Sequence, residues 1–200
     1  MSAVLTPTKM TPDEYLVWEE SQEERHEYIG GEVFAMTGGR VKHNRITLNT
    51  TVLLRSALDG LPCEVFAADM RVQAAHSREY FYPDIVVTCD PDDLGDDNAL
   101  ALRHPWFICE VLSDSTAAFD RGEKFDLYRE LPSLTHYLVI ETNRPHADLF
   151  CKSEQGLWVL HPLGLDDTLR IDQPHAIACP VALLFKGVAF DAPPAAITKS

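Results

Sequence analysis

Hydrophobic positions along the chain recur with two periods, one typical of helices and one typical of strands. A capping box with proline at the first helical position, Thr11-Pro12-Asp13-Glu14, marks the start of a first helix. Apolar positions with a helical period precede Gly60, and glycine commonly follows the last turn of a helix. Leu131-Pro132 stops a third helical segment. We therefore expect helices over about residues 11–20, 42–60 and 116–130.

The extended segments are short, and most of them are apolar. Gly30-Gly31 separates two of them and predicts a β-hairpin. Phe81–Val87 and Trp106–Leu112 are almost wholly apolar, which is typical of strands covered on both faces. We expect strands over residues 25–29, 32–37, 63–67, 70–74, 81–87, 106–112, 135–141, 147–152 and 157–161. This irregular order of helices and strands predicts an α/β (α+β) fold with a central mixed sheet flanked by helices.

Each of the two most apolar segments carries a single carboxylate, Asp84 in the first and Glu110 in the second. An ionised carboxylate in apolar surroundings is costly unless a partner compensates its charge. If the two strands lie side by side, the two carboxylates converge and can together hold a divalent cation. Lys124 follows at the start of the third helical segment and can reach the same region. Two acids and a lysine over the end of a sheet predict a site for metal-assisted phosphodiester hydrolysis.

The same residues allow a purely structural alternative. Asp84 can close a turn after Pro83, and Glu110 can form a buried salt bridge with Lys124 that has no catalytic role. The residue pattern alone leaves both interpretations open.

Length and charge limit what the chain can be. With 200 residues, we expect a single domain over 1–190 and a flexible tail over 191–200. The chain has neither an apolar run of about 18 residues nor a signal peptide, so we expect no membrane partner. A net charge of −14 argues against strong non-specific binding of nucleic acid, which depends on cationic neutralisation of phosphates. One local basic cluster, formed by Arg40, Lys42, His43 and Arg45, can contact phosphates or can be a solvated helix start.

Cysteines and histidines give no spacing signal for a metal site. The five cysteines at positions 63, 89, 109, 151 and 179 form no Cys-x-x-Cys pair, and the later histidines, His175 among them, occur singly. We therefore expect buried free thiols, a reducing cytoplasmic location and no zinc. The acidic segment 90–97 lacks the ligands of a calcium loop at Leu94 and Ala101, and we expect a solvated loop there.

Several motifs, in one order along the chain, resemble the Uma-two family, which is assigned as endonucleases with the restriction-endonuclease-like fold of the PD-(D/E)XK superfamily. The resemblance runs from about Thr11 to Glu141. Each motif is weak alone, and the ordered set is specific. The motifs are Arg25–Met36, His43, Tyr82-Pro83-Asp84, Glu110-Val111-Leu112-Ser113, Ser115-Thr116, Asp120-Arg121-Gly122-Glu123-Lys124, Tyr128, Leu131-Pro132-Ser133-Leu134 and Tyr137.

The resemblance implies a nuclease that depends on Mg²⁺ or Mn²⁺, with Asp84 and Glu110 as catalytic metal ligands. Leu112 occupies the position at which the superfamily normally has a lysine. The resemblance implies that Lys124, on the following helix, takes the place of that lysine. It also offers Glu27 as a further acidic ligand and His43 as a substrate contact.

We expect nucleic acid as the partner, DNA before RNA, and a homodimer. The alternative is a catalytically silent module that keeps the nuclease fold and binds nucleic acid or protein.

Overall fold

The computed structural model describes residues 9–36, 38–74, 79–113 and 116–190. The described helices are α1 (Pro12–Glu19), α2 (Val41–Ala57), α3 (Pro91–Leu94), α4 (Ala117–Arg121), α5 (Glu123–Tyr128) and a 3-10 turn over Val181–Leu183. The described strands are β1 (His26–Ile29), β2 (Glu32–Ala35), β3 (Glu64–Ala67), β4 (Val72–Gln73), β5 (Tyr80–Phe81), β6 (Ile85–Thr88), β7 (Phe107–Leu112), β8 (His136–Glu141), β9 (Ala147–Lys152), β10 (Trp158–Leu163), β11 (Thr168–Ile171) and β12 (Ile177–Pro180).

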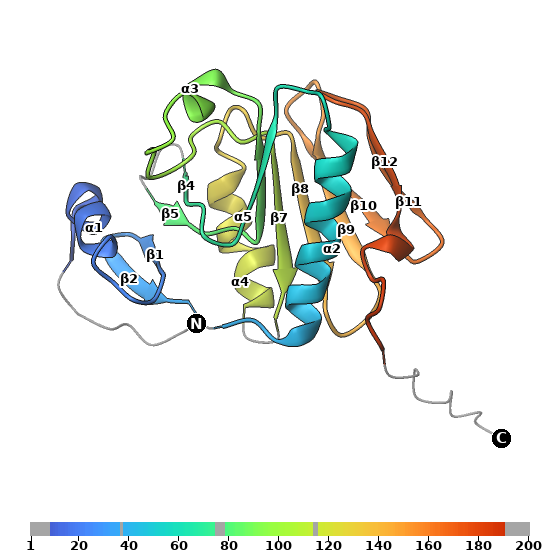
Figure 1. The fold of residues 1–200 in the computed structure, drawn as a ribbon, viewed down its shortest axis with the longest axis horizontal. Coiled ribbons are helices and arrows are strands. Elements are labelled where there is room, and N and C mark those ends of the chain that lie inside the picture. The colour runs from blue at the N-terminus through green and yellow to red at the C-terminus, as the bar shows by residue number, and fades with distance from the viewer. Residues whose placement is uncertain (1–8, 37, 75–78, 114–115, 191–200) are drawn as a thin grey trace.

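A six-stranded mixed sheet in the order β10-β9-β8-β7-β6-β3 forms the centre of the fold. Strands β7 and β8 run parallel, and the other neighbours in this sheet run antiparallel. Helix α2 covers one face, and α4 and α5 cover the other (Figure 1). A smaller sheet, β2-β1-β5-β4, lies with α1 beside the large one (Figure 1). The mixed α+β fold with a central sheet flanked by helices, expected from the sequence, is confirmed.

Alternation along β7 divides the core into two layers. Phe107 and Cys109 pack in the cluster that contains α2, whereas Ile108 and Leu112 pack in the cluster that contains α5. Because neighbouring residues of a strand point to opposite faces, Glu110 shares the α5 face with Ile108 and Leu112. The strand therefore carries one carboxylate into an apolar layer beneath α4 and α5.

Local sequence signals gave the N-terminal elements correctly. Thr11 and Glu14 form the expected capping box, in which each side chain accepts a hydrogen bond from the other residue's backbone N–H. Gly30 and Gly31 connect β1 and β2 with φ values of +60° and +93°, which glycine adopts without the penalty of a Cβ atom.

The first carboxylate segment forms two strands, so the single strand expected over 81–87 is wrong. β5 belongs to the small sheet and β6 to the large one. The chain changes sheet at Tyr82-Pro83-Asp84, because proline has no N–H to donate to a strand ladder. This break places Asp84 at the junction of the two sheets.

The third helix is also divided. Gly122 has φ −114° and ψ −99°, which are not helical values, and it separates α4 from α5. The continuous helix expected over 116–130 is therefore wrong at this residue. The sequence did not predict the two-stranded sheet of β11 and β12.

The acidic segment 90–97 contains the short helix α3, and its Asp93 is only 6% exposed. The Asp93 carboxylate accepts hydrogen bonds from the Thr88 hydroxyl at 2.9 Å and from the backbone N–H groups of Arg103 and His104 at 2.8 and 2.9 Å. The expectation of a solvated loop is thus wrong at Asp93, which connects this segment to the end of β6.

The expectation of free thiols is wrong for two of the five cysteines, because Cys63 and Cys89 form a disulfide. The antiparallel register pairs Glu64 of β3 with Thr88 of β6, so the next pair outward is Cys63 and Cys89. Cys109, Cys151 and Cys179 are free thiols. Across the described residues, no helix has the length and apolar character needed to cross a membrane. The tail expected over 191–200 lies outside the described residues.

Candidate active site

Asp84 and Glu110 meet where β6 and β7 lie side by side. The antiparallel register pairs Ile85 with Cys109, so the next pair along the two strands is Asp84 and Glu110. The Asp84 N–H donates to Glu110 Oε2 at 3.3 Å, and the Val111 N–H donates to Asp84 Oδ2 at 2.8 Å. Each carboxylate is therefore oriented by the backbone of the other strand. The structure brings together the two acids that the sequence singled out.

Lys124 lies in the same cluster and is 4% exposed. Its Nζ atom is 2.9 Å from Glu110 Oε1 and 2.7 Å from Glu27 Oε1. A third carboxylate, Asp120 one turn earlier in the chain, is 3.8 Å from the same nitrogen. Lys124 thus joins acids from β7, β1 and α4, so the small sheet contributes to the site through Glu27.

Aromatic rings complete the surroundings of the lysine. Nζ lies 5.6 Å from the Phe81 ring centroid and 6.0 Å from that of Tyr128, and each such contact contributes about 0.5–2 kcal/mol. The Tyr128 hydroxyl donates to Glu110 Oε1 at 3.3 Å. Leu112 is buried in the apolar cluster that contains Tyr128. The next position after Glu110 on the same face of β7 is therefore apolar, and the positive charge beside Glu110 comes from Lys124 on α5.

His43 approaches Asp84 from the first turn of α2. Its Nε2 atom is 3.2 Å from Asp84 Oδ1. A Cβ atom on Gly39 would lie 3.0 Å from His43 Nδ1, so a glycine there allows the chain to pass close to the ring. Lys42 and Arg45, from the same basic cluster, instead contact the C-terminal segment: the ammonium of Lys42 lies over Phe190, and Arg45 donates to the Gly187 carbonyl.

Burial and charge perturb the titration of these groups. Burial raises the pKa of Glu110 well above its usual value, and Asp120 and Asp84 add to this effect, although Lys124 opposes it. Burial likewise raises the pKa of Asp120. For Lys124, burial acts to lower the pKa, but Glu110, Glu27 and Asp120 outweigh it and raise that pKa well above the usual value. The lysine is therefore a positively charged ammonium group.

Burial also acts to lower the pKa of His43, but the hydrogen bond and charge of Asp84 outweigh it and raise that pKa.

The set of charges fits a divalent cation. Four carboxylates, those of Asp84, Glu110, Glu27 and Asp120, gather around Lys124 and His43. Acids outnumber basic groups in this buried cluster, and carboxylate oxygens are the ligands that Mg²⁺ prefers. Asp84 and Glu110 could hold such an ion, because their carboxylates meet at one pair of strand positions.

Sequence reasoning missed the place of Asp120 in this cluster and the contact of the Tyr128 hydroxyl with Glu110. Both belong to the family motifs. Asp120 lies four residues before Lys124, a spacing that places two side chains on the same face of a helix, and that signal could have found it. Burial of the Tyr128 hydroxyl against Glu110 depends on how α5 packs, which no local pattern reports.

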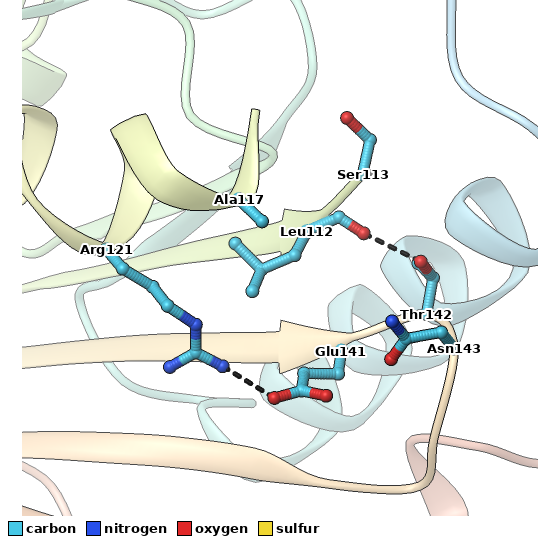
Figure 2. Close-up of a pocket in the computed structure, with 7 residues that line it drawn as sticks. All are labelled: Leu112, Ser113, Ala117, Arg121, Glu141, Thr142 and Asn143. Atoms are coloured by element: carbon cyan, nitrogen blue, oxygen red, sulfur yellow. Dashed lines mark hydrogen bonds and ion pairs between the residues drawn. The ribbon is translucent and has the colours of Figure 1, made fainter. Parts of the chain in front are cut away.

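A cavity of about 150 Å³ lies at the end of β7, where Leu112, two residues after Glu110, is part of its lining. Figure 2 shows two polar contacts in its lining: Arg121 points to Glu141, and Thr142 donates a hydrogen bond to the Leu112 carbonyl. The residues lining it are Leu112, Ser113, Ala117, Arg121, Glu141, Thr142 and Asn143.

Glu141 also belongs to a second group of possible metal ligands, with His146 and Asp148. Arg121 contacts both carboxylates of that group, so their charge is already compensated.

Comparisons with known proteins place the chain in a family. The model of the Uma2 family, described as "Putative restriction endonuclease", matches residues 12–182. An uncharacterized protein of Synechocystis sp. is 37% identical over 182 residues, which cover 91% of this chain and 94% of the relative. A second uncharacterized protein of Synechocystis sp. is 37% identical over 163 residues, which cover 82% and 92% of the two chains.

Among solved structures, a crystal structure of a putative nuclease belonging to DUF820 from Anabaena variabilis superposes with a TM-score of 0.70. The two chains are 15% identical, and the superposition covers 88% of this chain and 98% of the other. At that identity the likeness shows the fold alone.

Proposed function

Because this chain belongs to the Uma2 family of putative restriction endonucleases, we propose that it is a metal-dependent endonuclease that hydrolyses phosphodiester bonds of nucleic acid, with DNA as the first substrate to test. One observation carries the proposal. Asp84 and Glu110 meet at neighbouring strands beside a buried, protonated lysine. The two carboxylates supply the negative charge that binds a divalent cation, and the lysine supplies the positive charge that stabilises a phosphoryl group.

Asp84 and Glu110 would hold one or two Mg²⁺ or Mn²⁺ ions, together with the Val111 carbonyl. A divalent cation bound there supplies Lewis-acid activation of water and of the phosphate. The protein orients the ligands beforehand. The Val111 N–H fixes one oxygen of Asp84, and the Tyr128 hydroxyl and Lys124 fix one oxygen of Glu110.

Lys124 would stabilise the negative charge that grows on the phosphate oxygens. Its pKa is raised by three carboxylates, so it remains a cation and does not serve as a general base. Glu27 also contacts the ammonium, at 2.7 Å, and thereby limits its motion. Glu27 is on this account a positioning residue for the lysine, and His43 orients Asp84 at the edge where substrate approaches.

A second candidate function rests on the same contacts. The buried Lys124–Glu110 pair at 2.9 Å is also what the structural alternative requires, in which the ion pair only stabilises the fold. The chain would then be a catalytically silent module that binds nucleic acid or protein.

Metal-dependent cleavage separates the two candidates. A panel of duplex DNA, single-stranded DNA, supercoiled plasmid and RNA is incubated with wild type and Asp84→Ala, in Mg²⁺, in Mn²⁺ and in EDTA. Asp126→Ala serves as the matched control, because Asp126 is exposed on α5. We expect cleavage by wild type and by the control with metal only, and none by Asp84→Ala. A wild type that binds metal and cleaves no member of the panel favours the silent module.

Two further expectations from the sequence stay predictions. Sedimentation velocity tests the homodimer, and a single calorimetric unfolding transition tests the single domain over residues 1–190.

A further inference from the structure

Three potential metal ligands converge far from the candidate active site. Cys63 precedes β3, Cys89 follows β6, and His175 lies in the connection between β11 and β12. The two sulfur atoms and one ring nitrogen of His175 all lie within 4.8 Å of one another. Three segments that are distant in the sequence therefore bring two thiol groups and an imidazole to one point.

The surrounding structure holds each ligand in place. The β3–β6 register sets Cys63 opposite Cys89. The His175 ring packs edge-on against Trp106, with ring centroids 6.3 Å apart, and Trp106 is only 5% exposed. Strand pairing thus fixes both sulfur atoms, and a buried aromatic side chain supports the imidazole.

Solvent reaches this point from one side. A cavity of about 140 Å³ borders Cys63, and its lining includes Asp59, Glu64 and Arg55, which pairs with Glu64. All three ligand residues are half-buried. A cation, or a small thiol or disulfide, can therefore approach Cys63 through this cavity.

We propose that Cys63, Cys89 and His175 bind a Zn²⁺ ion when the two cysteines are reduced, and that formation of the disulfide releases it. Thiolate and imidazole are the ligands that zinc prefers, and three protein ligands leave its fourth position to water. Binding releases the two thiol protons to solvent.

Zinc is released by a thiol–disulfide exchange between the two cysteines and a low-molecular-weight disulfide such as oxidised glutathione. Two electrons pass from the protein thiolates to that disulfide, which leaves as two thiols after taking up two protons, and Zn²⁺ departs.

This site is separate from the carboxylate cluster in position and in chemistry. Asp84 precedes β6 and Cys89 follows it, so about five residues of extended chain, roughly 16 Å, lie between them. Asp84 and Glu110 offer oxygen ligands, whereas the cysteines offer sulfur.

Metal and disulfide both connect the edge strand β3 to β6, so the exchange replaces one cross-link by another. Sequence spacing gave no sign of the site, because its ligands come from three separate segments.

Cobalt binding tests the proposal on the full chain. The protein is reduced, freed of reductant under anaerobic conditions and titrated with Co²⁺, whose absorption reports its ligands. We expect a thiolate-to-cobalt charge-transfer band and the intense visible bands of a tetrahedral ion, both abolished by stoichiometric Zn²⁺. Cobalt held by carboxylates alone gives no thiolate band, so the candidate active site does not interfere.

Variants assign the ligands. Cys63→Ser and Cys89→Ser should lose the thiolate band, and His175→Ala, which keeps both sulfur atoms, should weaken Zn²⁺ binding by roughly 10²-fold. Cys151→Ser, which changes a partly exposed free thiol, is the matched control and should keep the spectrum.

Oxidised glutathione added to the zinc-loaded protein should release one Zn²⁺ and remove two titratable thiols per chain. The proposal is overturned by cobalt binding without the thiolate band, by a band that persists in Cys63→Ser, by unchanged zinc affinity in His175→Ala, or by a disulfide that resists reduction in the folded protein.

Discussion

Replacing Lys124 by methionine should destabilise the protein strongly, because this buried lysine is the cation that three carboxylates share. Glu27 Oε1 and Glu110 Oε1 lie 2.7 and 2.9 Å from its Nζ atom. These two oxygens are therefore within about 5.6 Å of each other, where two like charges repel by about 3 kcal/mol at an effective dielectric constant of about 20. Removing one partner of a buried ion pair typically costs about 3–5 kcal/mol. We expect Lys124→Met to lower the free energy of unfolding by that amount.

Urea denaturation at pH 8 in EDTA measures this loss, with the free energy of unfolding extrapolated linearly to water. Lys152→Met is the matched control, since Lys152 contacts the ring of Trp158 on the sheet edge, and it should cost less than about 1 kcal/mol. The double variant Lys124→Met/Glu27→Gln removes the repulsion as well and should recover about 2–3 kcal/mol of the loss. A loss below about 1 kcal/mol in Lys124→Met, or no recovery in the double variant, would refute the charge balance described for this cluster.

Three other predictions follow from the same structure. Asp84→Asn relieves the repulsion between residue 84 and Glu110, so the melting temperature of this variant should be unchanged or higher. Its stabilisation by Mg²⁺ should disappear, and thermal melts with and without the ion measure both effects. Lys124→Ala should cut the rate of cleavage roughly 10²-fold, while calorimetric titration still detects metal binding. Leu112→Lys added to Lys124→Ala should restore part of the rate. A rate unchanged in Lys124→Ala would place the lysine outside the mechanism. Burial lowers the pKa of His136 to about 4, below the usual value of about 6.5, so the unfolded chain binds the proton first as pH falls. Between pH 7 and pH 5, wild type and His161→Gln should therefore each lose about 2 kcal/mol of stability relative to His136→Gln, and the same pH dependence in all three proteins would contradict this assignment.

Sequence predicted those parts of the fold that local chemistry determines. The capping box at Thr11 and the glycine pair of the first hairpin act through atoms only a few residues apart, and both form as expected. The sheet break at Pro83 and the helix break at Gly122 carried local signals too, but the surrounding apolar pattern masked them. Cys63 and Cys89 pair through the register of two strands, which a linear pattern does not report.

Part of the candidate active site could also be predicted from the sequence. Asp84 and Glu110 stood out because a single carboxylate in an apolar strand needs compensation, and the structure places them together. Lys124 was expected near the two acids from its place after the second apolar segment, but its three acidic contacts depend on how α5 packs. The place of Asp120 and the contact of Tyr128 with Glu110 escaped notice because tertiary packing decides whether a polar side chain of a helix is buried.

The central claim is that the paired carboxylates support phosphodiester hydrolysis with a divalent cation. The most direct test is the initial rate of nucleic-acid cleavage against Mg²⁺ concentration, measured side by side for wild type, Glu110→Gln and the control Asp126→Asn. We expect wild type and the control to show a rate that rises with Mg²⁺ and saturates, and Glu110→Gln to lose roughly 10²-fold or more of it. Cleavage by Glu110→Gln at the wild-type rate, with the same dependence on Mg²⁺, would contradict the claim.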